Sequence, residues 1–169
     1  MKKRWMPILM LLLTVCWIAF IFVNSLEDGQ SSGAKSDAVK EVVDQVASSL
    51  GDSDGVSAVA IRKSGHILEF LVLGILLCLD AFSLRLLSLP IAIPRLLITG
   101  GAVLAVGAAV AALDETVQRF SEGRVSSGWD VLIDLGGVAI GMLIFAAVYA
   151  LVIRSRKKKQ TAADPATEN

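Results

Sequence analysis

Apolar residues fall along this chain of 169 residues in four long blocks, which polar stretches separate. The blocks run from Trp5 to Val23, from His66 to Leu84, from Leu96 to Leu113 and from Val131 to Ile153. A helix of about 20 residues crosses a hydrocarbon core of about 30 Å, and each block has about that length. The pattern therefore predicts an all-α membrane protein with four transmembrane helices in a compact bundle.

The polar segment 24–65, between the first two blocks, contains one further helical pattern. Ser36 suits the N-cap of this helix, and Gly51 suits the residue just after its end. Between them, apolar residues recur at the spacing of one helix face: Val39, Val42, Val43, Val46 and Leu50. We expect a short amphipathic helix outside the membrane, which lies on the membrane surface or over the helix ends.

Basic residues predict the orientation of the four helices. Lys and Arg accumulate in short cytoplasmic loops, and ten of the sixteen in this chain lie on the cytoplasmic side if the N-terminus is inside. Residues 1–4 and a basic, disordered tail of residues 154–169 are then cytoplasmic, and segment 24–65 is outside. The first block could also be a secretory signal, but the bulky Phe22 and Val23 favour an uncleaved anchor.

The composition supports a membrane environment and limits the chemistry. Hydrophobic residues make up 54% of the chain and the mean hydropathy is +0.67, which excludes an ordinary soluble domain. Cys16 and Cys78 both lie within apolar blocks, so neither a disulfide framework nor a cysteine metal site is expected. The lipid bilayer is the expected partner, nucleic acid is not, and the oligomeric state stays open.

Ionisable and polar residues gather at the ends of the second, third and fourth helices that are expected to face outward. A charged side chain deep in a bilayer costs about 2.5–3.5 kcal/mol, so such residues persist where they pair or line a cavity. We call this set the polar cluster; it comprises Arg62, Lys63, His66, Glu69, Asp114, Glu115, Gln118, Arg124, Asp130 and Asp134.

Helix periodicity predicts that the polar cluster points into the bundle. Asp130 and Asp134 share one face of the fourth helix with Gly137 and Gly141. The small residues at Gly137 and Gly141 form a seam that lets two helices approach closely. The carboxylates are therefore expected to face neighbouring helices and not lipid.

The residue types in the polar cluster allow three interpretations. The first is a network that holds helix ends together, and the second is a binding site for a charged headgroup or envelope fragment, with Arg124 as a fork-like donor. The third is catalysis or metal binding around His66. Since no serine or cysteine nucleophile motif and no second histidine occur, we predict no particular catalytic residue, no metal and no cofactor.

Two stretches within the cluster carry a family resemblance. Residues 62–70, R-K-S-G-H-I-L-E-F, are similar to the R-K-x-x-H-x-x-E-[FY] signature of the VanZ-like family. Residues 114–124 and the aspartates and glycines after them resemble that family's second signature, D-E-x-x-Q-x-F-x-x-G-R…D…G…G. The match covers about residues 5–153 and departs from the family at Asp134, where members commonly carry Asn.

The resemblance implies a protein of the bacterial cell membrane. The family's namesake is associated with resistance to the glycopeptide teicoplanin. A contribution to such resistance, by binding or shielding a lipid-linked envelope component or the glycopeptide at the outer face, is therefore the expected function. The alternative is a membrane-embedded enzyme that acts on a lipid-linked or headgroup substrate through the His, Glu and Asp residues of the polar cluster.

Overall fold

Five helices make up the described part of the chain. The computed structural model describes residues 5–27, 29–49, 56–84, 86, 93–121 and 128–163. The helices are α1 (Trp5–Leu26), α2 (Gly29–Ser49), α3 (Ala58–Ser83), α4 (Ile93–Gln118) and α5 (Gly128–Ala163). Four of them, α1, α3, α4 and α5, are long and apolar enough to cross a membrane. The all-α class and the four candidate spans are thus confirmed.

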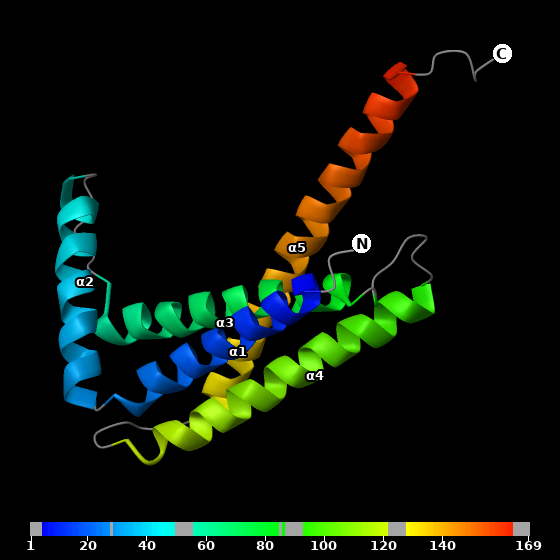
Figure 1. Cartoon of the computed structure of the whole chain (residues 1–169). Helices are drawn as coiled ribbons and strands as arrows, with labels where there is room; N and C mark the ends of the chain where they lie inside the picture. The colour runs from blue at the N-terminus through cyan, green and yellow to red at the C-terminus, as the bar shows by residue number, and fades with distance from the viewer. Residues whose placement is uncertain are drawn as a thin grey trace.

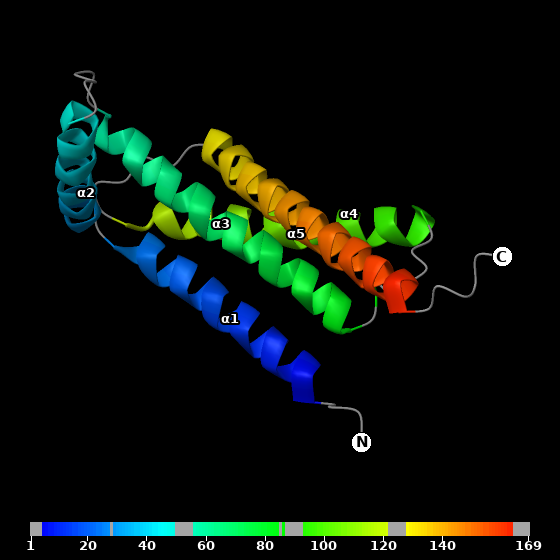
Figure 2. The same ribbon diagram turned by 90° about the horizontal axis from the view of Figure 1, so that it is seen from above.

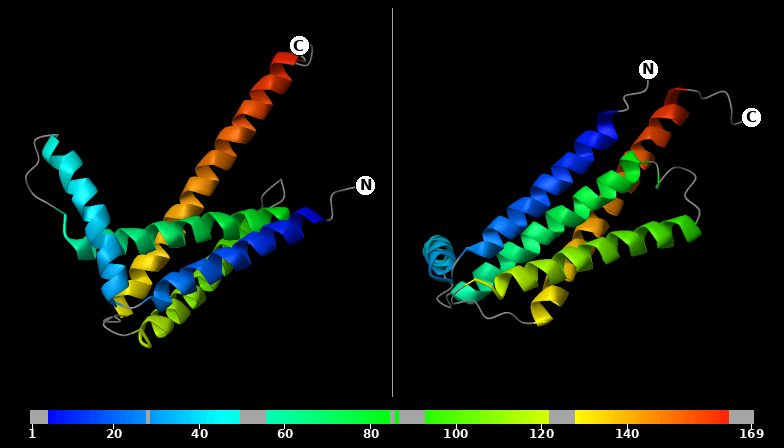
Figure 3. Two further views of the ribbon diagram at one scale, coloured as in Figure 1. Left: turned by 60° about the vertical axis from the view of Figure 1, so that its left-hand side comes forward. Right: turned by 60° about the horizontal axis from the view of Figure 1, so that its bottom comes forward.

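The four long helices alternate in direction, so that both ends of the described chain lie toward one end of the bundle (Figures 1 and 3). We call this the termini end. Helix α2 lies across the opposite end, which we call the α2 end (Figures 1 and 2). The bundle is compact only in part, because α5 diverges from α1 and α4 toward its C-terminus (Figure 1). The last buried residue of α5 is Gly141.

Glycines allow α3 and α5 to pack at backbone contact. A Cβ atom placed on Gly137 would lie 2.6 Å from the carbonyl oxygen of Ile67, and one on Gly141 would lie 2.2 Å from that of Leu71. Gly74 of α3 approaches α5 equally closely, since a Cβ atom placed on it would lie 2.4 Å from the Val138 carbonyl oxygen. Any larger side chain at these positions would force the helices apart. The glycine seam therefore sets how α5 sits on α3.

Apolar side chains from all four long helices form the core next to this seam. It contains one small group of buried residues, namely Ile21, Phe70, Leu73, Cys78, Val103, Val110, Ala111 and Val138. Most other large apolar residues of these helices remain exposed, as expected where lipid and not water surrounds the helices. The small core thus joins the helices near their middle, and polar residues occupy the α2 end.

The observed helices are longer than the apolar blocks. Helix α3 begins at Ala58 and not at His66, because the Ser57 hydroxyl accepts a hydrogen bond from the Ala60 amide and caps the helix there. The expected outer segment 24–65 therefore includes the first two turns of α3. Helix α4 likewise continues to Gln118, five residues beyond the apolar block. Hydropathy reports burial in lipid, whereas the backbone stays helical until a cap or turn ends it.

Helix α2 corrects the predicted start of the amphipathic helix. It begins at Gly29, so Ser36 lies inside it and is not an N-cap; the Ser36 hydroxyl instead donates to the Ser32 carbonyl oxygen at 2.9 Å. Val39 and Val42 of the predicted apolar face are exposed. A hydrogen bond from Lys40 lowers the pKa of Asp44. The predicted terminator Gly51 lies outside the described residues.

The expected disordered tail is also corrected in part. Helix α5 continues without a break from the last apolar residues to Ala163, so residues 154–163 are helical. Lys and Arg are good helix formers, and the preceding turns already provide the nucleus on which further turns add. The remainder of the predicted tail, residues 164–169, lies outside the described residues.

Candidate functional site

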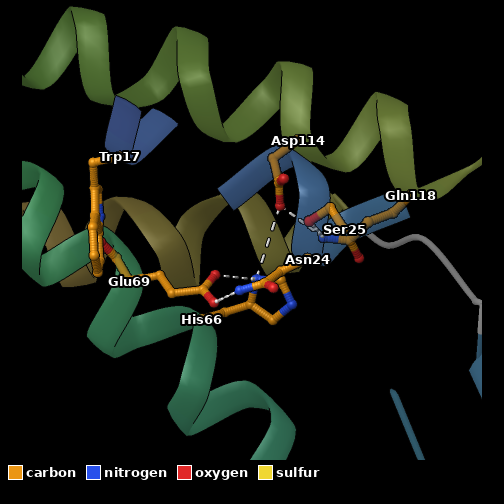
Figure 4. Close-up of polar contacts among 7 residues, drawn as sticks. All are labelled: Trp17, Asn24, Ser25, His66, Glu69, Asp114 and Gln118. Atoms are coloured by element: carbon orange, nitrogen blue, oxygen red, sulfur yellow. Dashed lines mark hydrogen bonds and ion pairs between the residues drawn. The ribbon is translucent and has the colours of Figure 1, made fainter. Parts of the chain in front are cut away.

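The described part of the polar cluster lies at the α2 end, where the ends of α1, α3, α4 and α5 meet. Helix α3 supplies His66 and Glu69, α4 supplies Asp114 and Gln118, and α1 adds Asn24 (Figure 4). These side chains point toward one another between the helices (Figure 4). The site therefore depends on how four helices pack and not on one local motif.

His66 lies between two carboxylates from different helices. Its Nδ1 is 3.8 Å from Asp114 Oδ2 and 3.9 Å from Glu69 Oε2 (Figure 4). Both distances exceed a hydrogen bond but allow strong electrostatic contact in a poorly hydrated site. The imidazole is thus placed to exchange a proton, or to share a bound cation, with either acid.

Helix α1 fixes Glu69 from two sides. Asn24 Nδ2 donates a hydrogen bond to Glu69 Oε1 at 2.7 Å, and Trp17 Nε1 donates to the Glu69 backbone oxygen at 2.9 Å (Figure 4). The second bond reaches a helix carbonyl that already accepts within α3, so it ties the backbones of α1 and α3 together at this turn. Glu69 is therefore positioned by α1 although it belongs to α3.

Asp114 is fully buried in a second hydrogen-bonded group. Gln118, one turn later on α4, donates through Nε2 to Asp114 Oδ2 at 2.8 Å and to Ser25 Oγ at 3.4 Å. Ser121 Oγ then donates to the Ser25 backbone oxygen at 2.9 Å. These bonds hold the end of α4 against the end of α1 and orient Asp114 toward His66.

Two further carboxylates are buried without hydrogen-bond donors. Asp134 is 2% exposed and Glu115 is 3% exposed. Within the described part of the chain, no group donates a hydrogen bond to either carboxylate. Asp134 also experiences the charges of Glu69, Asp114, Glu115 and Asp130. Isolated buried carboxylates are costly, so this arrangement calls for a cation or proton that the side chains do not supply.

A small pocket opens beside these groups. Its lining comprises Arg62, Lys63, His66, Gln118, Asp130, Ile133 and Asp134. Lys63 Nζ lies 2.7 Å from Asp130 Oδ1 and so links α3 to α5 at the rim. The pocket thus brings basic side chains of the rim and the buried carboxylate of Asp134 to one space.

Nine of the ten residues of the predicted cluster can be located, and they lie at the α2 end of the bundle. Arg124 lies outside the described residues. Gly137 and Gly141 lie on the face of α5 that contacts α3, about one and two helical turns after Asp134. The prediction missed the contributions of α1, namely Trp17, Asn24 and Ser25, and that of Ser121. Asn24 and Ser25 directly follow the first apolar block, which was the available signal.

A comparison with protein families agrees with the sequence signatures. A family model described as VanZ/LLP1 matches residues 10–151 of the chain. No curated protein and no solved structure matches it. The matched range contains every described residue of the site.

Proposed function

The chain belongs to the VanZ/LLP1 family, and on that premise we propose a binding function for its pocket. The protein resides in the bacterial cell membrane with both termini in the cytoplasm, so that the α2 end faces outward. There the pocket binds the charged headgroup of a lipid-linked envelope component. Binding shields that component and lowers the susceptibility of the cell to glycopeptides of the teicoplanin type.

The observation that carries this proposal is the state of Arg62. Its side chain lines the pocket, and within the described part of the chain it forms neither an ion pair nor a hydrogen bond. The neighbouring Lys63 is already engaged by Asp130. A guanidinium offers a planar fork of donors that matches phosphate and carboxylate groups. A phosphate or carboxylate group of the headgroup therefore binds at Arg62.

The buried acids support the same placement of the headgroup. Asp134 lines the same pocket, is more deeply buried than Arg62 and offers no donor to an anion, so the anionic group is held on the Arg62 side. A ligand with one anionic group at its accessible end satisfies both requirements. Phosphate or carboxylate groups of lipid-linked envelope components have that chemistry.

The proposal is tested in a glycopeptide-susceptible Gram-positive host. Cells expressing the wild type, Arg62→Ala or Arg156→Ala are compared at equal membrane levels for teicoplanin susceptibility and for binding of fluorescent teicoplanin. Arg156 is exposed on the far part of α5, so its variant is the charge-matched control. We expect the wild type and Arg156→Ala to protect, and Arg62→Ala to lose most of the protection. Equal behaviour of all three proteins, or no protection by any, contradicts the proposal.

The position of His66 favours a second candidate function. An imidazole between two carboxylates is an arrangement that general acid–base catalysis uses. In this alternative the protein is an enzyme on a lipid-linked substrate, and His66 moves a proton while Glu69 or Asp114 orients the ring. Pools of lipid-linked precursors should then change with the wild type and return to the control pattern with His66→Gln. Identical pools with both proteins exclude this alternative.

A further inference from the structure

Three side chains from three helices converge beside the pocket. His66 of α3, Asp114 of α4 and Asp134 of α5 each offer one ligand atom, and these atoms lie within 4.8 Å of one another. Figure 4 shows His66 and Asp114 directed at each other, with Nδ1 and Oδ2 3.8 Å apart. Atoms bound to one ion at about 2.0–2.2 Å stand roughly 3–4 Å from each other, so a small side-chain shift closes the set. We propose that these three residues bind one divalent transition-metal ion of the Zn²⁺ type.

The proposed role of the ion is to balance the negative charges of Asp114 and Asp134. As metal ligands the two aspartates are deprotonated and contribute two negative charges in a buried space, and a neutral imidazole adds none. One divalent cation neutralises the pair, whereas Lys63, the lysine that lines the pocket, is paired with Asp130. The unfavourable burial of two like charges thus becomes favourable coordination.

The unpartnered acids are a second, independent sign of a missing cation. Asp134 is 2% exposed, lines the pocket, and accepts no hydrogen bond from any described residue. Glu115 is 3% exposed, and neither of its oxygens has a donor among the described residues. Glu115 also acts electrostatically on Asp134. A hydrogen-bonded network that served only to join helix ends would satisfy these groups.

The ligand types select the class of ion. One imidazole nitrogen with two carboxylate oxygens suits Zn²⁺ and related first-row ions, whereas Mg²⁺ and Ca²⁺ prefer oxygen alone. Gln118 already holds the ligand Asp114 by a hydrogen bond, as outer groups around metal ligands commonly do. The single histidine of the sequence looked like a weak metal signal because its two partners lie on other helices.

The test measures Zn²⁺ alone on the full chain in lipid nanodiscs. Protein stripped with a chelator is titrated with Zn²⁺ against a chromophoric competitor, and bound metal is counted by elemental analysis. We expect one Zn²⁺ per chain and a Zn²⁺-dependent rise in melting temperature. Asp134→Asn and His66→Gln should each weaken binding by at least about 100-fold and remove that rise.

The matched control is Asp80→Asn, which changes a buried carboxylate of α3 near the termini end. It should bind Zn²⁺ like the wild type. Absence of stoichiometric Zn²⁺ in the wild type, or equal Zn²⁺ affinity in Asp134→Asn and Asp80→Asn, overturns the metal site. The inference does not rest on headgroup binding: Arg62→Ala should lose glycopeptide protection and still bind Zn²⁺.

Discussion

At the termini end of the bundle, Asp80 of α3 is buried beside a hydroxyl of α1, and Thr14 Oγ1 donates to Asp80 Oδ2 at 2.6 Å. At the α2 end, the buried carboxylates of Asp114 from α4 and Asp134 from α5 lie beside the imidazole of His66 from α3. Asp80 has a donor from the neighbouring helix for one of its oxygens. Asp134 and Glu115 have none among the described residues.

The difference separates a structural carboxylate from a functional group of carboxylates. A lone acid with a neutral donor fastens two helices at modest cost, since the donor stabilises its charge. Converging acids repel one another, and selection retains such a loss of stability chiefly where activity or binding requires it. Substitutions at the two ends of the bundle and in the seam between α3 and α5 test this contrast.

Substitution of Gly141 should disrupt the α2 end as a whole. In Gly141→Val the new side chain meets the Leu71 backbone oxygen, so α5 must move away from α3 and take Asp134 with it. We expect a loss of about 3 kcal/mol or more, seen as poor membrane accumulation and early aggregation in detergent size-exclusion chromatography. Gly136→Ala is the control, because no atom lies within 4 Å of a Cβ there. Similar behaviour of the two variants would refute the role of the seam.

Removal of the Thr14 hydroxyl should weaken the fold without touching the site. In Thr14→Val, Asp80 loses the hydrogen bond to its buried carboxylate, and we expect about 1.5–3 kcal/mol lower stability in thermal denaturation. Zn²⁺ affinity and glycopeptide protection should stay at wild-type levels. Thr116→Val is the matched control, since that exposed hydroxyl bonds only within its own helix. A loss of Zn²⁺ binding in Thr14→Val would erase the distinction between the two ends.

Neutralisation of Asp134 should raise the stability of the protein, whereas the two preceding substitutions lower it. In the presence of a chelator, Asp134→Asn should stabilise the protein by about 1 kcal/mol, because the buried carboxylate is removed from water and also repelled by its acidic neighbours. Melting curves of stripped wild type and variant measure this change. Asp80→Asn should stabilise less or destabilise under the same conditions. A clearly destabilised Asp134→Asn would mean that its carboxylate serves the fold.

Loss of the ion pair between Lys63 and Asp130 at the pocket rim should have the smallest effect on stability. Lys63 and Asp130 are 42% and 27% exposed, so solvent screens their attraction and Lys63→Met should cost about 0.5 kcal/mol. The difference between wild type and variant should shrink further at high salt. Thermal denaturation at two ionic strengths measures it. A loss as large as that of Thr14→Val would show that the rim pair, too, holds the helices together.

The fold was largely predictable because lipid imposes a simple pattern on sequence. Four apolar blocks of spanning length identified the long helices, and i, i+4 spacing placed Asp130 and Asp134 on one face with the seam glycines. The helix ends were predicted less well. They depend on caps such as Ser57 and on backbone continuity, which hydropathy does not register.

Only the site residues of α3, α4 and α5 could be predicted from the sequence, and those of α1 could not. Their polar residues stand out against apolar neighbours, whereas Trp17 resembles any membrane aromatic until its Nε1 is seen to bond the Glu69 carbonyl. Which acids meet His66 depends on the register between helices. That register follows from contacts such as Gly141 against Leu71, and no single helix encodes them.

Helix α5 is an unbroken rod of 36 residues, ~54 Å long at about 1.5 Å per residue. A helix of this length that crosses a hydrocarbon core of about 30 Å extends roughly 24 Å beyond it. Asp134 sits near one end, the exposed Arg154 and Arg156 near the other, and the close contact with α3 at Gly137 and Gly141 lies between. The part of α5 before the glycine contact, which carries Asp134, is short, whereas the part after it, which carries Arg154 and Arg156, is much longer. A tilt imposed on its basic end is therefore expected to change the position of Asp134 relative to His66.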